Sequence, residues 1–420
     1  MSKIRPFKAV TYNLKKVHDL SKLVCPPYDV ISDDEALFLR NMSPHNFIHL
    51  LLAKDKKGDN KDNNKYTRAR DLYNQWIDKG ILTQDKTPGI YFYKQEYTFL
   101  GQRRKRVGFI SLMELQDESD SNVFPHENTH SAAVDDRLQL WQSLDANLSC
   151  IFVCYSDKQR KIEKIFTRDV LSSSPILELT DKDNIKHILW KLEDEHLIKE
   201  MNSTIAGQHL FIADGHHRYK VAMAYRQIRM ARKKNISGEE PFNYVMTYFT
   251  NIDSKDLQIF PIHRIVKRLP KRLDFLEDLF RIDKIKHKND LAVMLARAGR
   301  NEHAFGLYSR EGIRLLRLKN KMLINKYVDN GSVDYKSLDA TILKYFIFDR
   351  IGVRSDDIIY TENIDEAAAM VDNGQADVCF IMNPVKISQL KAIALNGERM
   401  PPKTTYFYPK VLSGLTVYKM

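Results

Sequence analysis

Apolar and polar residues alternate along the chain in a pattern that predicts both strands and helices. The apolar run 210–213 is typical of a short buried strand, and Asp214-Gly215 ends it with a turn signal. Apolar residues then recur at the spacing of one helix face, at Val221, Ala224, Tyr225 and Ile228. A helix is therefore predicted directly after the turn, with Asp214 as its N-cap.

Further elements are predicted before residue 265. Residues 57–65 are uniformly polar and predict a flexible loop. The stretches 91–100 and 107–112 predict a β-hairpin whose tip carries the basic run 103–106. The remaining elements predicted here are helices at 66–79, 135–145 and 181–201, and strands at 149–155, 244–251 and 257–262.

The character of the chain changes near residue 265. Leu269-Pro270 interrupts the pattern, and a helix, a strand, a helix and a hairpin around Glu311-Gly312 follow. Near the end, a helix at 364–373, a strand at 378–382 and a helix at 387–395 are predicted. We therefore predict an α+β fold in two lobes, a main lobe at 1–265 and a smaller α/β lobe at 266–420.

Composition narrows the class of protein. No apolar run reaches the roughly 18–20 residues that cross a bilayer, so no membrane partner is expected. The first residues lack the apolar core of a signal peptide, and four cysteines fit a reducing compartment, so a cytoplasmic location is expected. The net charge of +12 is scattered, and we interpret each basic cluster as solvated surface. A nucleic-acid partner is therefore not favoured, and the oligomeric state stays open.

The first turn of the helix after Gly215 has an unusual charge. Helix N-termini favour acidic side chains, but this one carries His216, His217 and Arg218. Basic groups fit there if an anion lies between them, because the backbone N–H groups of such a turn bind phosphate. The turn 214–218 is therefore interpreted as a phosphate site, the alternative being a capped helix with solvated basic residues.

The chain resembles a known family at this turn. The segment 214–219, with the sequence DGHHRY, and the segment 25–32, with the sequence CPPYDVIS, resemble the DUF1015 family, a widespread microbial family without an assigned function. The turn also resembles the Gly-x-His-Arg phosphate loop of the ParB/sulfiredoxin-like superfamily, which includes kinases of free serine. This second resemblance implies a mixed-sheet nucleotide-binding core. Further segments that match the family are 125–129, 136–138, 147–149, 261–264 and 400–410.

The segment 126–130 reads HENTH and fits the zinc-protease signature H-E-x-x-H. That chemistry requires a helix, but Pro125 precedes the segment, and Asn128 and Thr129 are poor helix formers. A zinc hydrolase using His126 and His130 is therefore a weak alternative. We interpret His126, Glu127 and Thr129 as part of a polar active-site loop instead.

Other polar residues are candidates for the same site. Asp29 follows two prolines, whose rigid backbone can hold one carboxylate in a fixed direction, although an Asx-turn is equally compatible. Arg137, expected in the first turn of its helix, is predicted either to reach the anion or to pair with a neighbouring acid. A basic and aromatic segment contains Lys403, Tyr406, Tyr408 and Lys410; it either closes over a nucleotide or packs as an edge strand, and Lys403 and Tyr408 are its candidate substrate contacts.

The function predicted from these features is phosphoryl transfer from a nucleotide, ATP or ADP, to a small polar metabolite. Free L-serine is the favoured acceptor, and Mg²⁺ is the expected metal. Glu127, Asp29 and His217 are the catalytic candidates, with Glu127 preferred over Asp29 as the base. Neither a P-loop nor a G-x-G-x-x-G fingerprint is present in the sequence. The alternatives are a phosphoserine phosphatase using the same pocket and a non-catalytic ParB-like protein that binds nucleotide or nucleic acid.

Overall fold

The computed structural model describes residues 3–99, 101–117, 121–129, 131–233, 235 and 237–420. Contacts within the chain divide it into two units. The first unit contains Met1–Phe124, Thr129–Leu257 and Pro409–Met420, and the second contains Pro125–Asn128 and Gln258–Tyr408. This division differs from the expected one at residue 265, because two short segments distant in sequence join the other unit.

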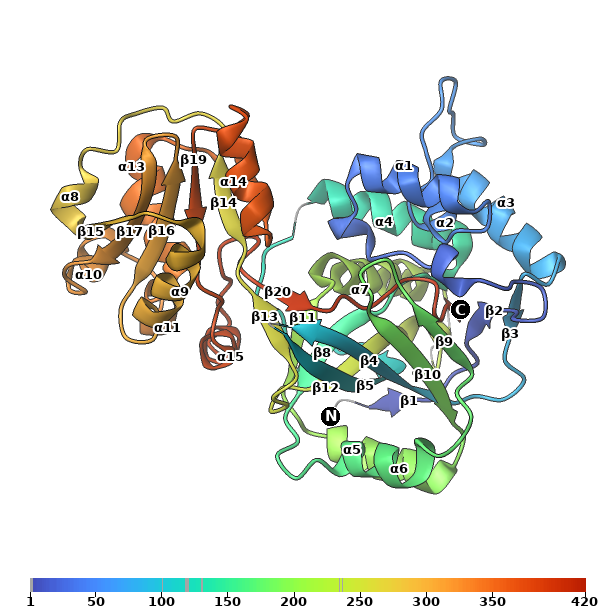
Figure 1. Ribbon diagram of the computed structural model, residues 1–420. Coiled ribbons are helices and arrows are strands. Elements are labelled where there is room, and N and C mark those ends of the chain that lie inside the picture. The colour runs from blue at the N-terminus through green and yellow to red at the C-terminus, as the bar shows by residue number, and fades with distance from the viewer. Residues whose placement is uncertain (1–2, 100, 118–120, 130, 234, 236) are drawn as a thin grey trace. The chain divides into compact units, whose positions relative to one another are not determined.

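A large mixed sheet forms the centre of the first unit (Figure 1). The pairs β11–β6 and β12–β8 are parallel, and the other neighbours are antiparallel. The predicted hairpin is present and supplies the two longest strands. In sheet order the strands are β6 (Val123–Phe124), β11 (Leu210–Asp214), β8 (Ile151–Tyr155), β12 (Tyr244–Asn251), β5 (Gln102–Glu114), β4 (Ile90–Phe99), β10 (Lys186–Leu192) and β9 (Leu177–Thr180), with β1 (Ile4–Arg5) beside β5.

Helices cover both faces of this sheet. Figure 1 shows α5 (Lys161–Ile165) and α6 (Glu195–Ile205) on one side. An apolar core containing Phe92, Phe109 and Phe249 is buried in this unit, with the last two rings stacked 4.9 Å apart. The helices on the other side are α1 (Asp33–Met42), α2 (Ile48–Leu51), α3 (Lys65–Asp78), α4 (Ser131–Leu144) and α7 (His216–Arg232).

Two predictions for this unit were wrong. The segment 181–201, predicted as one helix, forms β10 and the first part of α6. Strand β10 pairs with β4 on one side and β9 on the other, and such long-range pairing overrides local pattern. Helix α4 begins at Ser131 rather than Asp135, so Arg137 lies in its second turn and not in its first.

The basic run at the hairpin is not entirely solvated, which corrects the interpretation of all four residues as surface. Arg106 is 1% exposed and lies on the sheet face, with its guanidinium carbon 4.8 Å from the ring centre of Phe152. Its guanidinium donates to the side chain of Gln95 and to the carbonyl oxygen of Pro409. The sequence could not indicate this, because the partners lie 11 and 303 residues away.

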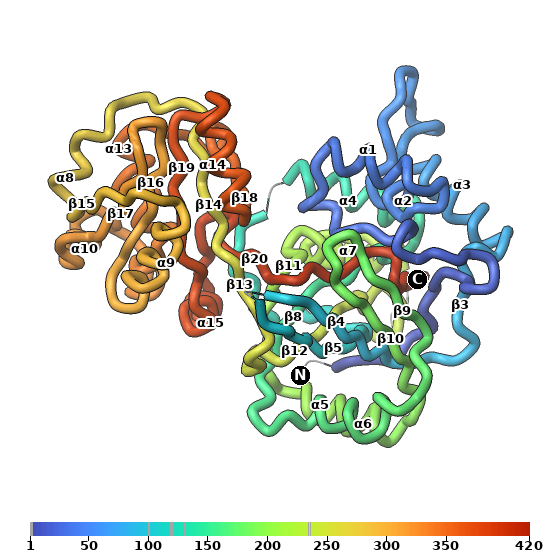
Figure 2. The backbone as a smooth tube through the Cα atoms, viewed as in Figure 1, coloured from blue at the N-terminus to red at the C-terminus, as the bar shows by residue number. Residues whose placement is uncertain are grey.

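The final residues belong to the first unit through backbone pairing. β21 (Tyr418–Lys419) pairs with β7 (Ala146–Asn147). Isolated bridges join Val417 to Val10 and Ser413 to Cys25. Nearby, β2 (Val10–Tyr12) pairs with β3 (Leu82–Gln84). Figure 2 follows this segment, at the red end of the colour bar, to the C-terminus.

The second unit contains a smaller sheet whose strand pairs are all antiparallel, together with helices. The hairpin around Glu311-Gly312 and the elements predicted near the end are confirmed. In sheet order the strands are β15 (Phe280–Ile285), β17 (Gly312–Leu318), β16 (Ala304–Ser309), β19 (Val378–Ile381), β14 (His263–Val266) and β18 (Ile358–Thr361), and a separate pair joins β13 (Gln258–Phe260) to β20 (Tyr406–Tyr408). The helices are α8 (Leu276–Leu279), α9 (Lys288–Ala298), α10 (Leu323–Tyr327), α11 (Val333–Lys336), α12 (Asp339–Leu343), α13 (Asp349–Ile351), α14 (Ile364–Asp372) and α15 (Ile387–Leu395).

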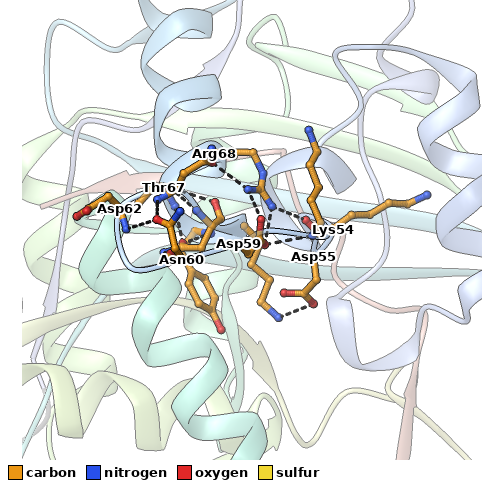
Figure 3. A network of polar contacts seen from close by, with 12 residues as sticks. Lys54, Asp55, Asp59, Asn60, Asp62, Thr67 and Arg68 are labelled. Carbon is orange, nitrogen blue, oxygen red and sulfur yellow. Dashed lines mark hydrogen bonds and ion pairs between the residues drawn. The ribbon is translucent and has the colours of Figure 1, made fainter.

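The predicted polar loop before α3 carries its own hydrogen-bond network (Figure 3). Arg68 forms a two-pronged ion pair with Asp59, at 2.7 and 2.9 Å, and also donates to the carbonyl oxygen of Lys54. Asn60 accepts from the backbone N–H of Asp62, and Asn64 caps α3. Among the described residues, none of the helices combines the length and apolar character that a membrane span requires.

Candidate functional site

The turn that joins β11 to α7 is the centre of the candidate site. Gly215 has φ +88° and ψ 32°, the left-handed conformation that glycine adopts most easily, and α7 begins at His216. Gly215, and not Asp214 as predicted, is the N-cap of α7, and no side chain caps the helix. Its first-turn backbone N–H groups are therefore not used by a capping side chain.

Asp214 is instead held by two cations. Lys410 Nζ lies 3.1 Å from its Oδ2, and Arg218 Nη2 lies 3.3 Å from its Oδ1. Burial alone would raise the pKa of Asp214, but Lys410 and Arg218 hold that pKa well below its ordinary value. The carboxylate is therefore charged at neutral pH. Its ion pairs hold the Lys410 and Arg218 side chains beside the start of α7.

Arg218 is the third residue of α7 and is 4% exposed. It donates to the carbonyl oxygen of Cys150, and its Nη2 lies 3.9 Å from Asp29 Oδ1. Among the described residues, three buried polar atoms near this turn have no hydrogen-bond partner: Arg218 Nε, Tyr28 Oη and Asp29 Oδ1. Unsatisfied buried groups are costly, so such a cluster is typical of a binding site.

Arg137 lies beside the same cluster. Its guanidinium carbon is 4.7 Å from the ring centre of Tyr28, and it forms an ion pair with Asp136. Asp136 also accepts from Tyr66 and pairs with Lys65, 3.0 Å away. Of the two alternatives for Arg137, the pairing with a neighbouring acid is the one observed. Arg137 therefore fixes the ring of Tyr28, which carries one of the unsatisfied atoms.

The two histidines of the turn lie in the first turn of α7. His216 is buried and His217 is half-buried. His216 also lowers the pKa of Asp214, by less than Lys410 and Arg218 do, whereas burial acts in the opposite direction. The turn thus brings together Asp214, Gly215, His216, His217 and Arg218, with Asp29 beside it.

Lys410 belongs to the basic and aromatic segment in which the sequence predicts candidate substrate contacts. Lys403 and Tyr408, the two residues selected from that segment, belong to the second unit, whereas Lys410 belongs to the first. In the second unit, the carbonyl oxygen of Lys403 accepts from Arg264, and the Tyr408 ring stacks on Phe260 at 4.5 Å. Lys410 lies in the family-like segment 400–410, and that resemblance is the signal that could have identified it.

The polar loop with His126 and Glu127 belongs to the second unit, while Thr129 belongs to the first. His126 is fully buried, and its Nε2 lies 3.0 Å from Thr405 Oγ1. Glu127 forms a bridge with Met400, and its charge acts on Arg264. The parts of three family-like segments that belong to this unit, 125–128, 261–264 and 400–408, therefore meet within it.

The zinc-protease alternative has no support among the described residues. Residues 126–129 are not helical, and His130 lies outside the described residues. Within the described ranges, no group of three His, Cys, Asp or Glu residues is arranged to hold a metal ion.

The family-like segments that precede residue 341 all lie within the sequence model of one family. Its sequence model, described as "Protein of unknown function (DUF1015)", matches residues 4–341. This chain belongs to the DUF1015 family. The resemblance stated from the sequence is thereby confirmed. Lys410 lies beyond the residues that the DUF1015 model matches, as do Lys403 and Tyr408.

Solved structures with some likeness to this DUF1015 chain share little sequence with it. A mutant free serine kinase in complex with AMP is 13% identical, with a TM-score of 0.36 over 68% of this chain and 84% of that one. A conserved hypothetical protein from Pyrococcus furiosus is 12% identical, with a TM-score of 0.35 over 71% and 92% of the two chains. SbnI from Staphylococcus aureus, with a C-terminal truncation, is 11% identical, with a TM-score of 0.35 over 71% and 84%. No curated protein matches the chain.

Proposed function

We propose that this chain is a nucleotide-dependent phosphotransferase that acts on a small polar metabolite, with free L-serine as the favoured acceptor. The observation that carries the proposal is the set of unsatisfied buried atoms at the start of α7, Arg218 Nε, Tyr28 Oη and Asp29 Oδ1. A phosphate satisfies the two donors and the helix N-terminus at once. The proposal includes the ParB/sulfiredoxin-like nucleotide core and the cytoplasmic location, which both remain predictions from the sequence.

The proposed phosphate contacts come from the turn and from Lys410. Arg218 Nε and the backbone N–H groups of the first turn of α7 donate to phosphate oxygens, and His216 and His217 add charge when protonated. Lys410, which pairs with Asp214 in this structure, neutralises the charge of a further phosphate oxygen. ATP or ADP is the nucleotide that supplies the phosphoryl group.

Mg²⁺ fits this cluster through Asp29. Both oxygens of Asp214 lie 3.1–3.3 Å from cations, whereas Asp29 Oδ1 lies 3.9 Å from Arg218 Nη2 and has no hydrogen-bond partner among the described residues. Mg²⁺ commonly needs only one or two carboxylates when phosphates and water complete its shell. When bound, the ion neutralises charge on the transferred phosphoryl group.

The accepting hydroxyl loses its proton to a carboxylate as its oxygen bonds to phosphorus and the bond to the nucleotide breaks. We propose Glu127 first and Asp29 second as that base. His126 and Arg137 have partners within the protein, so we propose that they position the loop and Tyr28, whereas Thr129, Lys403 and Tyr408 remain candidate substrate contacts. Glu127→Gln should abolish turnover while nucleotide still binds. If Asp29→Asn alone has that effect, Asp29 is the base.

The first test is formation of phosphoserine from serine and ATP or ADP. Arg218→Ala and His217→Ala should each reduce the rate by about 100-fold or more, because each removes a group that stabilises charge on the transferred phosphate. Tyr28→Phe should weaken nucleotide binding without loss of stability, since it removes a hydroxyl with no hydrogen-bond partner among the described residues and keeps the ring packed against Arg137.

Arg229→Ala is the matched control. Arg229 lies in the same helix but at its other end, where it pairs with Asp145 at 3.3 Å, so full activity is expected. Full activity of both Arg218→Ala and His217→Ala would contradict the site. Release of phosphate from phosphoserine without nucleotide would instead support the phosphatase alternative, since the same cluster holds a phosphate in either direction.

A further inference from the structure

A second recess lies wholly within the second unit and contains a buried cation. The space inside it that water can occupy is about 20 Å³, so only one end of a small ligand fits inside and the rest lies at the open mouth. Arg264, which ends the family-like segment 261–264, lines it and is 5% exposed. The polar residues that share the lining are Asp339, Asn383, Gln389 and Thr404.

Arg264 has no close counter-ion in the described part of the chain. Its two hydrogen bonds go to the carbonyl oxygens of Ile262 and Lys403, which use two of the five N–H donors of a guanidinium. Burial lowers the pKa of Arg264 to about 10, and the more distant charges of Asp339 and Glu127 offset this only in part. His263 beside it also has a pKa lowered by burial, to about 4, so it is neutral at pH 7. A buried charge in this state is stabilised by an anionic ligand.

Asn383 also lines the recess and carries an amide donor. Its Nδ2 atom is buried and has no hydrogen-bond partner among the described residues. The amide is packed tightly against Gly299, because a Cβ at Gly299 would lie only 2.3 Å from Asn383 Nδ2. A guanidinium that has carbonyl partners but no carboxylate partner, together with an amide nitrogen that has no acceptor, matches the two oxygens of a carboxylate.

Asp339 indicates which carboxylate the recess accepts. One oxygen of Asp339 faces His303 Nδ1 at 2.9 Å, and the side chain is 21% exposed. Its negative charge disfavours a simple anion and favours a ligand that also carries an ammonium group. We infer that this recess binds a small α-amino acid, whose carboxylate contacts Arg264 and Asn383 and whose ammonium group faces Asp339.

This inference concerns binding in the second unit and does not require phosphoryl transfer. The test is calorimetric titration of the full chain, without nucleotide, with glycine, serine, acetate and ethanolamine at constant ionic strength. Glycine and serine should bind, acetate should bind at least about tenfold more weakly, and ethanolamine should not bind, because it lacks the carboxylate. Ethanolamine binding as tightly as serine, or acetate as tightly as glycine, would overturn the assignment.

Three variants locate the site. Asn383→Leu and Gly299→Ala should each weaken serine binding by about tenfold or more, the first by removing the donor and the second by displacing it. Gly299 has φ −63°, so alanine fits its backbone and the variant should fold, as a thermal melt without ligand will verify. Arg229→Ala, at the other end of α7 from the candidate phosphate site, should bind serine and glycine as the wild type does. Unchanged binding of glycine, which has no hydroxyl to accept a phosphoryl group, in both Asn383→Leu and Gly299→Ala would refute a site at Arg264.

Discussion

At the scale of single residues, the chain keeps several ionisable side chains away from water and controls their charge by what surrounds them. Asp214 is charged because two cations face it, and its pKa is held well below the ordinary value against the effect of burial. His263 shows the opposite case. It is 3% exposed, it lies next to Arg264, and its Nδ1 accepts the backbone N–H of Met382 at 3.1 Å, so it is kept neutral.

The neutral state of His263 predicts a pH-dependent stability. Its pKa is about 4 in the folded chain, against roughly 6.5 for an unfolded histidine. Between these values the unfolded state binds the proton and the folded state does not, so stability falls as pH decreases from 6.5 to 4. The shift corresponds to a loss of about 3 kcal/mol. Urea unfolding at pH 7, 5.5 and 4 should show that His263→Gln, which keeps an acceptor, loses less stability than the wild type over this range. Parallel pH profiles for the two would contradict this.

At the scale of elements, the turn between β11 and α7 joins backbone geometry to side-chain chemistry. The pairing register of β11 with β8 shifts between Ile212 and Asp214, so a bulge precedes the turn. Gly215 then takes φ +88°, and the Arg218 guanidinium lies close to it. A Cβ at Gly215 would lie 2.9 Å from Arg218 Nε, one of the unsatisfied atoms.

Gly215→Ala should therefore lower the free energy of unfolding by more than a replacement that strains only the backbone. Gly207 is the matched control, because it has φ +75° but nothing within 4 Å of its Cβ position. Gly207→Ala should lose about 1 kcal/mol of unfolding free energy, from the left-handed backbone. Gly215→Ala should lose more, and should also weaken nucleotide binding, because Arg218 must move. Equal losses in urea unfolding and unchanged nucleotide affinity would show that Arg218 adapts at no cost.

At the scale of the whole molecule, the segment 409–420 completes the first unit although it follows the entire second unit in sequence. It forms bridges with Val10 and Cys25, and Ser413 Oγ lies 2.7 Å from Ser149 Oγ. The carbonyl oxygens of Pro409 and Lys410 accept from Arg106 and Gln95, and the Lys410 side chain reaches Asp214. The segment thus satisfies buried donors and one buried charge.

Truncation after Tyr408 should therefore destabilise the first unit. It leaves Arg106 and Asp214 with fewer partners, and breaking a buried ion pair costs about 3–5 kcal/mol. Limited proteolysis should cleave within the first unit. Deletion of Met420 alone, which removes one backbone hydrogen bond to Asp145, a contact with Asn147 and the packing of one side chain, should give a pattern much closer to that of the wild type. The single variant Lys410→Met should give a smaller loss, since it keeps the backbone contacts. Resistance of the truncated chain to proteolysis would contradict the proposed role of the segment.

What the sequence determined by itself is the local structure of segments with strong short-range signals. The strand, turn and helix at 210–232, the hairpin of β4 and β5, and the elements from α14 to α15 all follow from apolar spacing and from glycine at the turns. The motif segments also singled out Asp214 and Arg218 from the charge of a helix N-terminus, and Asp29 from the two prolines before it, and the structure places these three side chains together. Their role in a site stays a prediction.

Only the tertiary structure decided the rest, since it depends on partners hundreds of residues apart. Pairing with β4 and β9 made β10 a strand, and the face of the sheet buried Arg106. The return of the last residues placed Lys410 beside Asp214, across 196 positions of sequence. Apolar spacing and turn residues report on neighbours within a few positions, so neither these contacts nor the recess at Arg264 had a local signal.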